Sequence, residues 1–189
     1  LIEKCCHYFD LINLFAQSYP KSIYASGGQA FNFIDFTYCG KNSDIGDHAF
    51  VIIEYQNGIK ANFTLNMFCP DFSEELILCA KKGKIISSEK YSPKNNNYSG
   101  TKIQIELGEE GSSRNSIVSY PSDIEKSGHH GATFYEHIEF IKKLNSDSSN
   151  SATVLEGLWS VIIASAAQKS IETGNQINMD DFLEKHNLS

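Results

Sequence analysis

The spacing of apolar residues changes twice along the chain, and these changes predict the order of its secondary structure. Apolar residues recur at helical spacing in the first segment, and proline disfavours helix at the residue before it, so we expect an opening helix that ends near Ser18 to Pro20. The middle of the chain has strand-like spacing. From Phe134 onward, the spacing is again helical. The expected order is therefore helix, strands, helices.

The middle segment carries strand signals joined by short turns. The sequence Gln56-Asn57-Gly58 is a tight hairpin signal between a β-branched run and an alternating run, and Lys81-Lys82-Gly83 is a second one. We expect the pair Gly27-Gly28 to form a bulge within a strand. The polar segment 92–100 is expected to be a loop. The expected strands cover 22–33, 49–55, 59–67, 75–80, 84–87, 102–107 and 116–120.

Three helical segments close the chain. An apolar stripe predicts a helix to Leu144, a longer helix is expected over 153–173 with Gly174 as its C-terminal cap, and a short one over 178–184. Burial preferences place Trp159 and Phe134 in the core. The pattern predicts an α+β fold with a large open, mostly antiparallel β-sheet and helices packed on one face, in a single domain over 1–189. The uncovered face predicts a homodimer or homotetramer that pairs through the open sheet.

The opening helix carries a polar stripe that is the best sequence clue to function. Glu3, His7 and Asp10 follow the spacing i, i+4, i+7, which places an imidazole between two carboxylates on one helix face. An ordinary solvated face with a histidine that serves only structure would give the same spacing. Both interpretations remain open at this point.

The composition is that of a soluble globular protein, with 41% hydrophobic residues and a formal net charge of −7. An acidic chain argues against nucleic acid and anionic membranes as partners, and no apolar run approaches the ~18 residues of a membrane span. Five cysteines without a C-x-x-C spacing predict free thiols in a reducing cytoplasm. A zinc site that uses Cys5, Cys6 or His7 with downstream histidines has poor ligand spacing, so we expect no metal.

The chain begins at Leu1 without a residue that caps the first helical turn, which leads us to expect a fragment. Within it, the order of several motifs resembles the Gfo/Idh/MocA oxidoreductases, and specifically their C-terminal domain. The motifs lie at 3–11 (EKCCHYFDL), 47–58 (DHAFVIIEYQNG), 128–131 (GHHG), 155–159 (LEGLW) and 170–177 (SIETGNQI). The resemblance implies a Rossmann domain, outside this sequence, that binds most of an NAD or NADP coenzyme. No G-x-G-x-x-G is present here.

The same resemblance assigns roles to individual residues. The family's acid-x-x-x-histidine helix motif falls on Glu3 and His7, although many members have Asp where Glu3 stands, which implies His7 as the acid/base of hydride transfer. Substrate contacts are implied for Lys4, Asp10, His129 and His130, and Lys4 is distinct from the lysine of the family's nucleotide domain. Asp is common in the family where this chain has Thr133, which weakens any transfer of substrate detail.

Three functions are carried forward from the sequence. The leading one is an NAD(P)-dependent oxidoreductase of a sugar, polyol or related hydroxyl compound, in which this domain shapes the substrate site and is inactive alone. The second is a non-catalytic sugar-binding or interaction module, and the third is a metal-dependent hydrolase that uses the histidines. Whether the full-length protein has an intact coenzyme site distinguishes the second function from the first. Metal analysis of the purified protein tests the third function.

Overall fold

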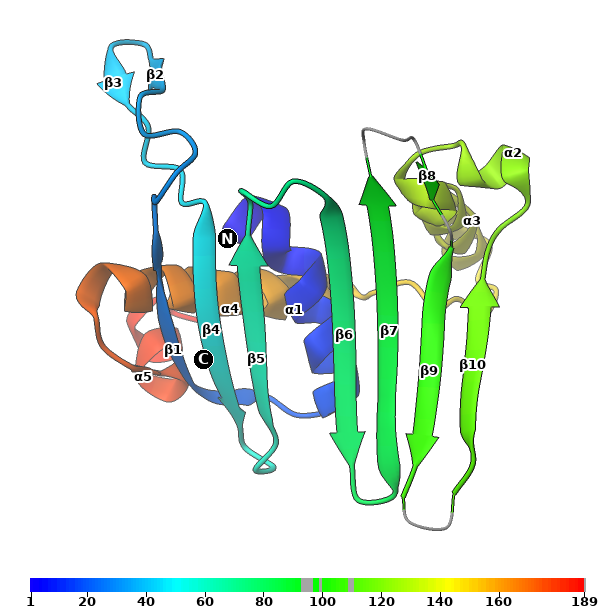
Figure 1. Cartoon of the computed structure of the whole chain (residues 1–189). Helices are drawn as coiled ribbons and strands as arrows, with labels where there is room; N and C mark the ends of the chain where they lie inside the picture. Colours follow the sequence, from blue (N-terminus) through cyan, green and yellow to red (C-terminus); the bar gives the residue numbers. More distant parts are fainter. Residues whose placement is uncertain (93–96, 99, 109–110, 189) are drawn as a thin grey trace. The chain divides into compact units, whose positions relative to one another are not determined.

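The structure is a computed structural model that describes residues 1–92, 97–98, 100–108 and 111–188. The chain divides into two compact units. Unit 1 combines Leu1–Phe68 with Ala152–Ser189, and unit 2 is Cys69–Ser151. Each unit contains helices and an antiparallel sheet, so the α+β fold class is confirmed (Figure 1).

Unit 1 is built around a four-stranded antiparallel sheet with the order β11-β1-β4-β5. A two-stranded hairpin, β2-β3, projects from the connection between β1 and β4 (Figure 1). Its elements are α1 (Ile2–Ala16), β1 (Pro20–Gly28), β2 (Thr37–Tyr38), β3 (Lys41–Asn42), β4 (His48–Tyr55), β5 (Lys60–Asn66), α4 (Val154–Thr173), β11 (Ile177–Asn178) and α5 (Met179–Lys185).

Three helices cover one face of the unit 1 sheet and form its core. Helices α1 and α4 pack against each other, and α4 and α5 contact β1 (Figure 1). Strand β4 alternates between buried and more exposed residues, so its apolar side chains divide between the two faces. The largest fully buried side chains are Tyr55, Phe9, Ile23, Ile53, Ile163, Met179 and Val51.

The other face of this sheet is open and partly apolar within unit 1. Tyr24 on β1 and Phe50 and Ile52 on β4 are 42%, 57% and 50% exposed. Ile52 lies directly across from Tyr24 and from Asn62 of β5, so an apolar centre is flanked by the polar side chains of β5. Helices on one face and an open second face agree with the pattern expected from the sequence.

Local sequence signals set the ends of the helices in unit 1. The opening helix ends at Ala16, and Gln17 follows in the left-handed conformation. Helix α4 begins with a capping box, in which Thr153 accepts from the amide of Glu156 while the Glu156 carboxylate accepts from the amide of Thr153. It ends at Gly174, whose φ of 69° is easily reached only by glycine and a few polar residues.

Unit 2 contains a five-stranded antiparallel sheet with the order β10-β9-β7-β6, and β8 pairs with β7. Its helices follow the last strand. The elements are β6 (Phe72–Ala80), β7 (Gly83–Ser92), β8 (Asn97–Tyr98), β9 (Thr101–Leu107), β10 (Ser113–Val118), α2 (Ser122–Glu125), the 3-10 turn η1 (His129–Gly131) and α3 (Ala132–Leu144).

Several sequence expectations differ from the structure in detail. Strand β1 ends at Gly28. The bulge expected at Gly27-Gly28 is wrong, because Gly27 pairs regularly with Ala49, and the register shift of this strand lies between Pro20 and Ser22. A Cβ on Gly27 would lie 2.5 Å from the carbonyl oxygen of His48, so close strand approach explains the glycine. In the expected loop 92–100, residues 93–96 and 99 lie outside the described residues.

The apolar stripe of α3 is not buried within the described part of the chain. Phe134, Ile141 and Leu144 are 38%, 51% and 69% exposed, whereas Trp159 of α4 is half-buried against the unit 1 core. The expected core position is therefore closer to the structure for Trp159 than for Phe134 of α3. Across the residues described, no helix is both long and apolar enough to cross a membrane.

Candidate functional site

Helix α1 carries four of the six residues that the sequence singled out. Glu3, Lys4 and His7 are exposed and Asp10 is half-buried, while the opposite face of the helix buries its apolar side chains in the core. The helical period thus separates a packing face from a polar edge, as the i, i+4, i+7 spacing predicts. A carboxylate, an ammonium group and an imidazole are all presented within two turns.

The imidazole of His7 contacts one end of a row of aromatic side chains. Its ring lies 4.0 Å from the ring of Tyr8, centroid to centroid, with a tilt of 43°. Tyr8 stacks on Phe63 of β5 at 5.3 Å, and Phe63 also contacts Phe9 edge to face at 5.1 Å. The row connects His7 to the sheet and leaves the imidazole exposed to solvent. An exposed imidazole on a packed helix is suited to exchanging protons with a ligand.

Asp10 lies in a different electrostatic setting from His7. Burial raises the pKa of the Asp10 carboxyl, and the nearby carboxylate of Glu156 raises it further. Glu156 is held in place by the capping box of α4. Both effects make ionisation of Asp10 less favourable than that of an exposed aspartate.

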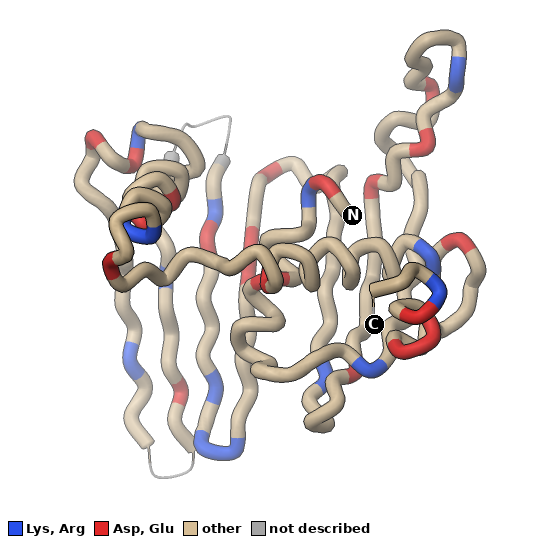
Figure 2. Tube along the Cα trace, turned by 180° about the vertical axis from the view of Figure 1, so that it is seen from behind, with Lys and Arg blue, Asp and Glu red and all other residues tan. Residues whose placement is uncertain are grey.

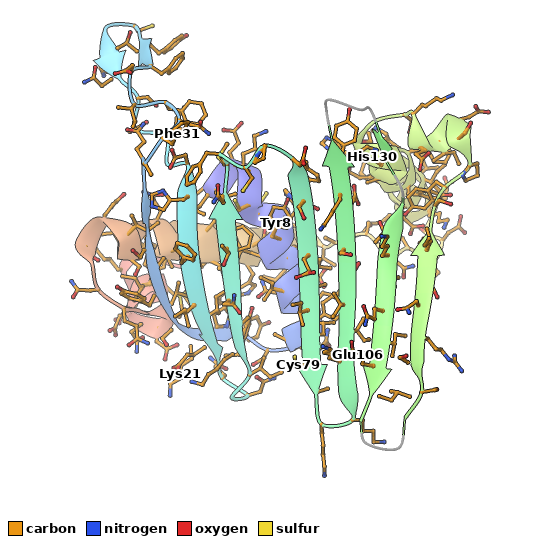
Figure 3. The ribbon with its side chains drawn as sticks, in the orientation of Figure 1. Tyr8, Lys21, Phe31, Cys79, Glu106 and His130 are labelled. Carbon is orange, nitrogen blue, oxygen red and sulfur yellow. The ribbon has the colours of Figure 1, made fainter. Side chains whose placement is uncertain are left out.

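The other two residues that the sequence singled out belong to unit 2. His129 and His130 lie in a turn whose four residues, from Gly128 to Gly131, all have positive φ, with 45° and 52° at the two histidines. Gly131 is required there, because a Cβ would lie 2.8 Å from the ring of Tyr120. His130 is labelled in Figure 3, and its Nε2 lies 3.9 Å from Oε1 of Glu89.

One buried acid was missed by the sequence reasoning. Asp47 is fully buried, and its carboxylate accepts hydrogen bonds from the amides of Ala30, Phe31 and Asn32 and from Nδ1 of His48. Burial alone would raise the pKa of Asp47, but these hydrogen bonds outweigh it and hold the pKa well below its usual range. The acid lies just before a dense strand run, which is the only local signal of its role.

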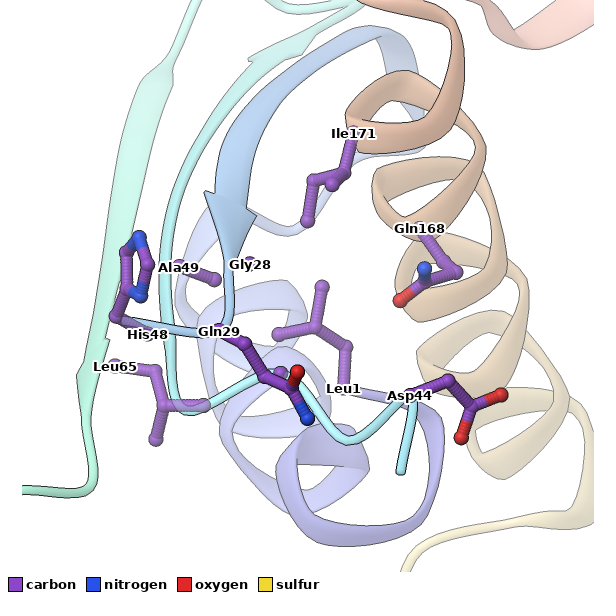
Figure 4. A pocket seen from close by; sticks show the side chains of 10 residues that line it. Leu1, Gly28, Gln29, Asp44, His48, Ala49, Leu65, Gln168 and Ile171 are labelled. Carbon is purple, nitrogen blue, oxygen red and sulfur yellow. The ribbon is translucent and has the colours of Figure 1, made fainter. Parts of the chain in front are cut away.

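A small cavity of about 160 Å³ lies in unit 1 beside the start of α1 (Figure 4). It is smaller than the roughly 300–1,000 Å³ of typical ligand pockets, so within this unit it does not enclose a sugar. Polar and apolar side chains both line its wall (Figure 4). Its lining comprises Leu1, Gly28, Gln29, Asp44, Gly46, His48, Ala49, Leu65, Gln168 and Ile171.

A metal ion and a dinucleotide each require a particular arrangement of groups. No group of three His, Cys, Asp or Glu among them is arranged to hold a metal. A dinucleotide pyrophosphate favours a glycine-rich loop at a helix start. Helices α1, α4 and α5 each carry an acid in the first turn, and α3, which carries none, follows the turn 128–131 (GHHG) and not a G-x-G-x-x-G loop. Figure 2 shows these acidic positions in red. The described residues therefore do not fit a dinucleotide by themselves.

Comparison with known sequences identifies one family. The family described as "Oxidoreductase family, C-terminal alpha/beta domain" matches residues 1–179. No curated protein matches the sequence.

Solved structures share the fold at low sequence identity. A levoglucosan dehydrogenase in complex with NADH and levoglucosan is 12% identical with a TM-score of 0.70, over 94% of this chain and 49% of that one. An oxidoreductase from Agrobacterium radiobacter, in complex with NAD+, L-tartaric acid and magnesium, is 16% identical with a TM-score of 0.62, over 97% and 50%. The WlbA dehydrogenase from Bordetella pertussis, in complex with NADH and UDP-GlcNAcA, is 16% identical with a TM-score of 0.57, over 93% and 45%.

The chain thus spans about half the length of these similar structures. At this low identity the structural similarity shows a shared fold alone, whereas the family match over residues 1–179 shows the family. The chain belongs to the Gfo/Idh/MocA oxidoreductase family, in which it corresponds to the C-terminal alpha/beta domain.

Proposed function

We propose that this chain is the substrate-binding and oligomerisation domain of an NAD(P)-dependent oxidoreductase that acts on a secondary alcohol of a sugar, polyol or related hydroxyl compound. The observation that carries the proposal is the exposed edge of α1, where Glu3 and His7 stand one turn apart at the family's acid-x-x-x-histidine positions. The family match supports the same assignment.

In this proposal, His7 exchanges the proton of the reacting hydroxyl. Oxidation of an alcohol requires a base for the hydroxyl proton, and a neutral imidazole is suited to accept it near pH 7. Glu3 orients the ring or accepts a second substrate hydroxyl. Lys4, Asp10, His129 and His130 contact other substrate groups through their polar side chains.

The coenzyme is proposed to be bound mainly by a separate Rossmann domain, because the residues described here do not fit a dinucleotide. Hydride transfer would be the chemistry that NAD or NADP supplies when bound there. The groups of this chain then bind the substrate, orient it and exchange its proton. The chain alone is expected to be inactive.

The proposal is tested on the complete protein that contains this chain. Reduced-nicotinamide absorbance is followed with a panel of sugars and polyols and with each coenzyme, for wild type and His7→Ala. Loss of the proton acceptor is expected to lower kcat by roughly 10²–10⁴-fold while coenzyme affinity is unchanged. His137→Ala is the control, since His137 is an exposed histidine of α3 to which the proposal gives no role.

The outcomes separate the candidate functions. Unchanged turnover in His7→Ala would remove His7 from the mechanism. If the wild-type protein neither turned over a substrate nor bound a coenzyme, the non-catalytic sugar-binding module would replace the oxidoreductase.

The open face of the unit 1 sheet is proposed as the oligomerisation surface. Tyr24, Phe50 and Ile52 together expose an apolar centre, and apolar surface of this kind is favourable to bury against a second copy. A homodimer or a homotetramer is expected. The corresponding test is given in the Discussion.

A further inference from the structure

Four side chains of different chemistry gather around one end of β7 in unit 2. Oε1 of Glu89 lies 3.9 Å from Nε2 of His130, and Oε2 of Glu89 accepts a hydrogen bond from the hydroxyl of Thr101 at 3.3 Å. The ring of Tyr91 lies 5.4 Å from that of His130, centroid to centroid. The side chains of Glu89 and His130 are 22% and 30% exposed. The cluster is therefore ordered by its own contacts, and part of Glu89 and of His130 is exposed.

The fold explains why these residues meet. Glu89 and Tyr91 are two residues apart on β7, so their side chains leave the same face of the sheet. Thr101 begins the neighbouring strand β9, whose register with β7 continues from the pair Ser88 and Lys102. The left-handed turn before α3 then brings His130 to this face.

A second acid lies beside Glu89 in the sheet. Glu74 of β6 lies directly across from Glu89. The nearby Lys90 and Lys102 alternate with Glu89 and Thr101 along their strands, so their side chains leave the opposite face. Nε2 of His130 lies within ion-pair range of Glu89, and the imidazole is charged only when protonated.

We propose that Glu89 is a specificity-determining residue that selects neutral polyhydroxy substrates over those that carry a carboxylate. The inference rests on the proposed function, in which His130 contacts the substrate. Glu89 positions the imidazole of His130 and, as a carboxylate, accepts hydrogen bonds from substrate hydroxyls. The aromatic face of Tyr91 packs against the C–H groups of the same ligand.

The selection follows from the acceptor-only chemistry of a carboxylate. A hydroxyl group can donate to Glu89, whereas an ionised carboxylate in the same place has no proton to donate and is repelled. The half-buried setting strengthens this repulsion relative to open water. D-glucose and D-glucuronate form a matched pair of probes, because they differ only in the CH₂OH or carboxylate at C6.

The test measures kcat/KM and equilibrium binding of D-glucose and D-glucuronate with the complete protein. Wild type is expected to favour D-glucose, and Glu89→Gln is expected to shift the ratio towards D-glucuronate by about tenfold. Glu89→Asp keeps the charge and is expected to retain the preference. Glu75→Gln is the matched control, since Glu75 pairs with Ser88 and therefore lies on the opposite face of the same sheet.

Thermal unfolding of each variant confirms that the fold is retained. A ratio that is unchanged in Glu89→Gln, an equal shift in Glu75→Gln, or failure of wild type to bind either sugar would overturn the assignment of Glu89. If wild type binds D-glucose but turns over no substrate with either coenzyme, the oxidoreductase proposal fails. The binding ratio would still report on Glu89 in that case.

Discussion

Oδ1 of Asp47 lies 2.9 Å from Nδ1 of His48, and the same carboxylate accepts hydrogen bonds from three successive backbone amides, those of Ala30, Phe31 and Asn32. One buried acid therefore joins the start of the β1–β4 connection to the start of β4. Because that connection carries the hairpin β2-β3 and several exposed apolar side chains, including Phe31 (Figure 3), the carboxylate fixes the base of an otherwise exposed segment.

Asp47→Asn is expected to destabilise the protein near pH 7. The amide that replaces the carboxylate loses the charge-assisted hydrogen bonds, so Tm should fall by about 5–10 °C. The folded-state pKa of Asp47 is depressed, so its contribution is present above the ordinary Asp pKa of about 3.9 and is lost as the pH falls below that value. Tm measured from acidic to neutral pH should therefore decline less steeply on the acid side in the variant.

Asp44 provides the control for this measurement, because it lies exposed on the same connection. Asp44→Asn should leave both Tm and its acid dependence close to those of wild type. Equal Tm values for wild type and Asp47→Asn across the pH range would show that the carboxylate does not anchor the segment.

Tyr55→Phe is expected to lower the free energy of unfolding by about 1–2 kcal/mol. The buried hydroxyl of Tyr55 donates to Oδ1 of Asn13 at 2.8 Å and so joins β4 to α1. Burial also raises the pKa of Tyr55, so wild type, unlike the variant, should lose stability above about pH 10 as the unfolded tyrosine ionises. Urea unfolding measures the difference. Tyr38→Phe, at a position 74% exposed, should change stability little.

Asp10→Asn is expected to raise Tm at pH 7 by about 1–3 °C. The folded-state pKa of Asp10 is raised by burial and by Glu156, so its carboxylate reduces stability once the pH exceeds the usual Asp value, and the gain from Asn should vanish below about pH 4. Thermal unfolding at pH 4 and pH 7 tests this, with the exposed Asp35→Asn as control. A more stable variant with lower activity would support the proposed substrate contact of Asp10.

Phe50→Glu is expected to convert the proposed oligomer to monomer. The substitution places a charge in the apolar centre of the open face, where Phe50 is 57% exposed, and should weaken self-association by about 100-fold or more. Sedimentation velocity over a concentration series measures the change. Leu14→Glu introduces the same charge at an exposed position of α1 and should leave association intact. A wild-type protein that stays monomeric at high concentration would remove this surface from consideration.

Elements governed by local chemistry were predictable from the sequence. The hairpin at Asn57-Gly58 and the helix terminus at Gly174 depend on residues close together in the chain, and each is found where the pattern indicates. The edge formed by Glu3 and His7 also follows from helical spacing alone. Its catalytic role remains a prediction, because exposure and spacing are shared by ordinary surface helices.

Features that depend on distant segments were not predictable. The amides that bind Asp47 lie 15 to 17 residues earlier in the chain, and no periodic pattern links them. The contact of Glu89 with His130 requires a left-handed backbone conformation at His129 and His130. This conformation is uncommon for residues other than glycine, so the sequence does not predict it. The division of the strands between two sheets likewise follows from tertiary pairing.

The insertion of Cys69–Ser151 between the two parts of unit 1 has a consequence during synthesis. The apolar sheet face that includes Ile23 and Val51 leaves the ribosome before Ile163 of α4 has been translated. At typical bacterial or eukaryotic elongation rates, the interval lasts on the order of ten seconds. During that time the nascent chain exposes the surface that later becomes its core, which makes it a natural client for chaperones that bind the emerging polypeptide.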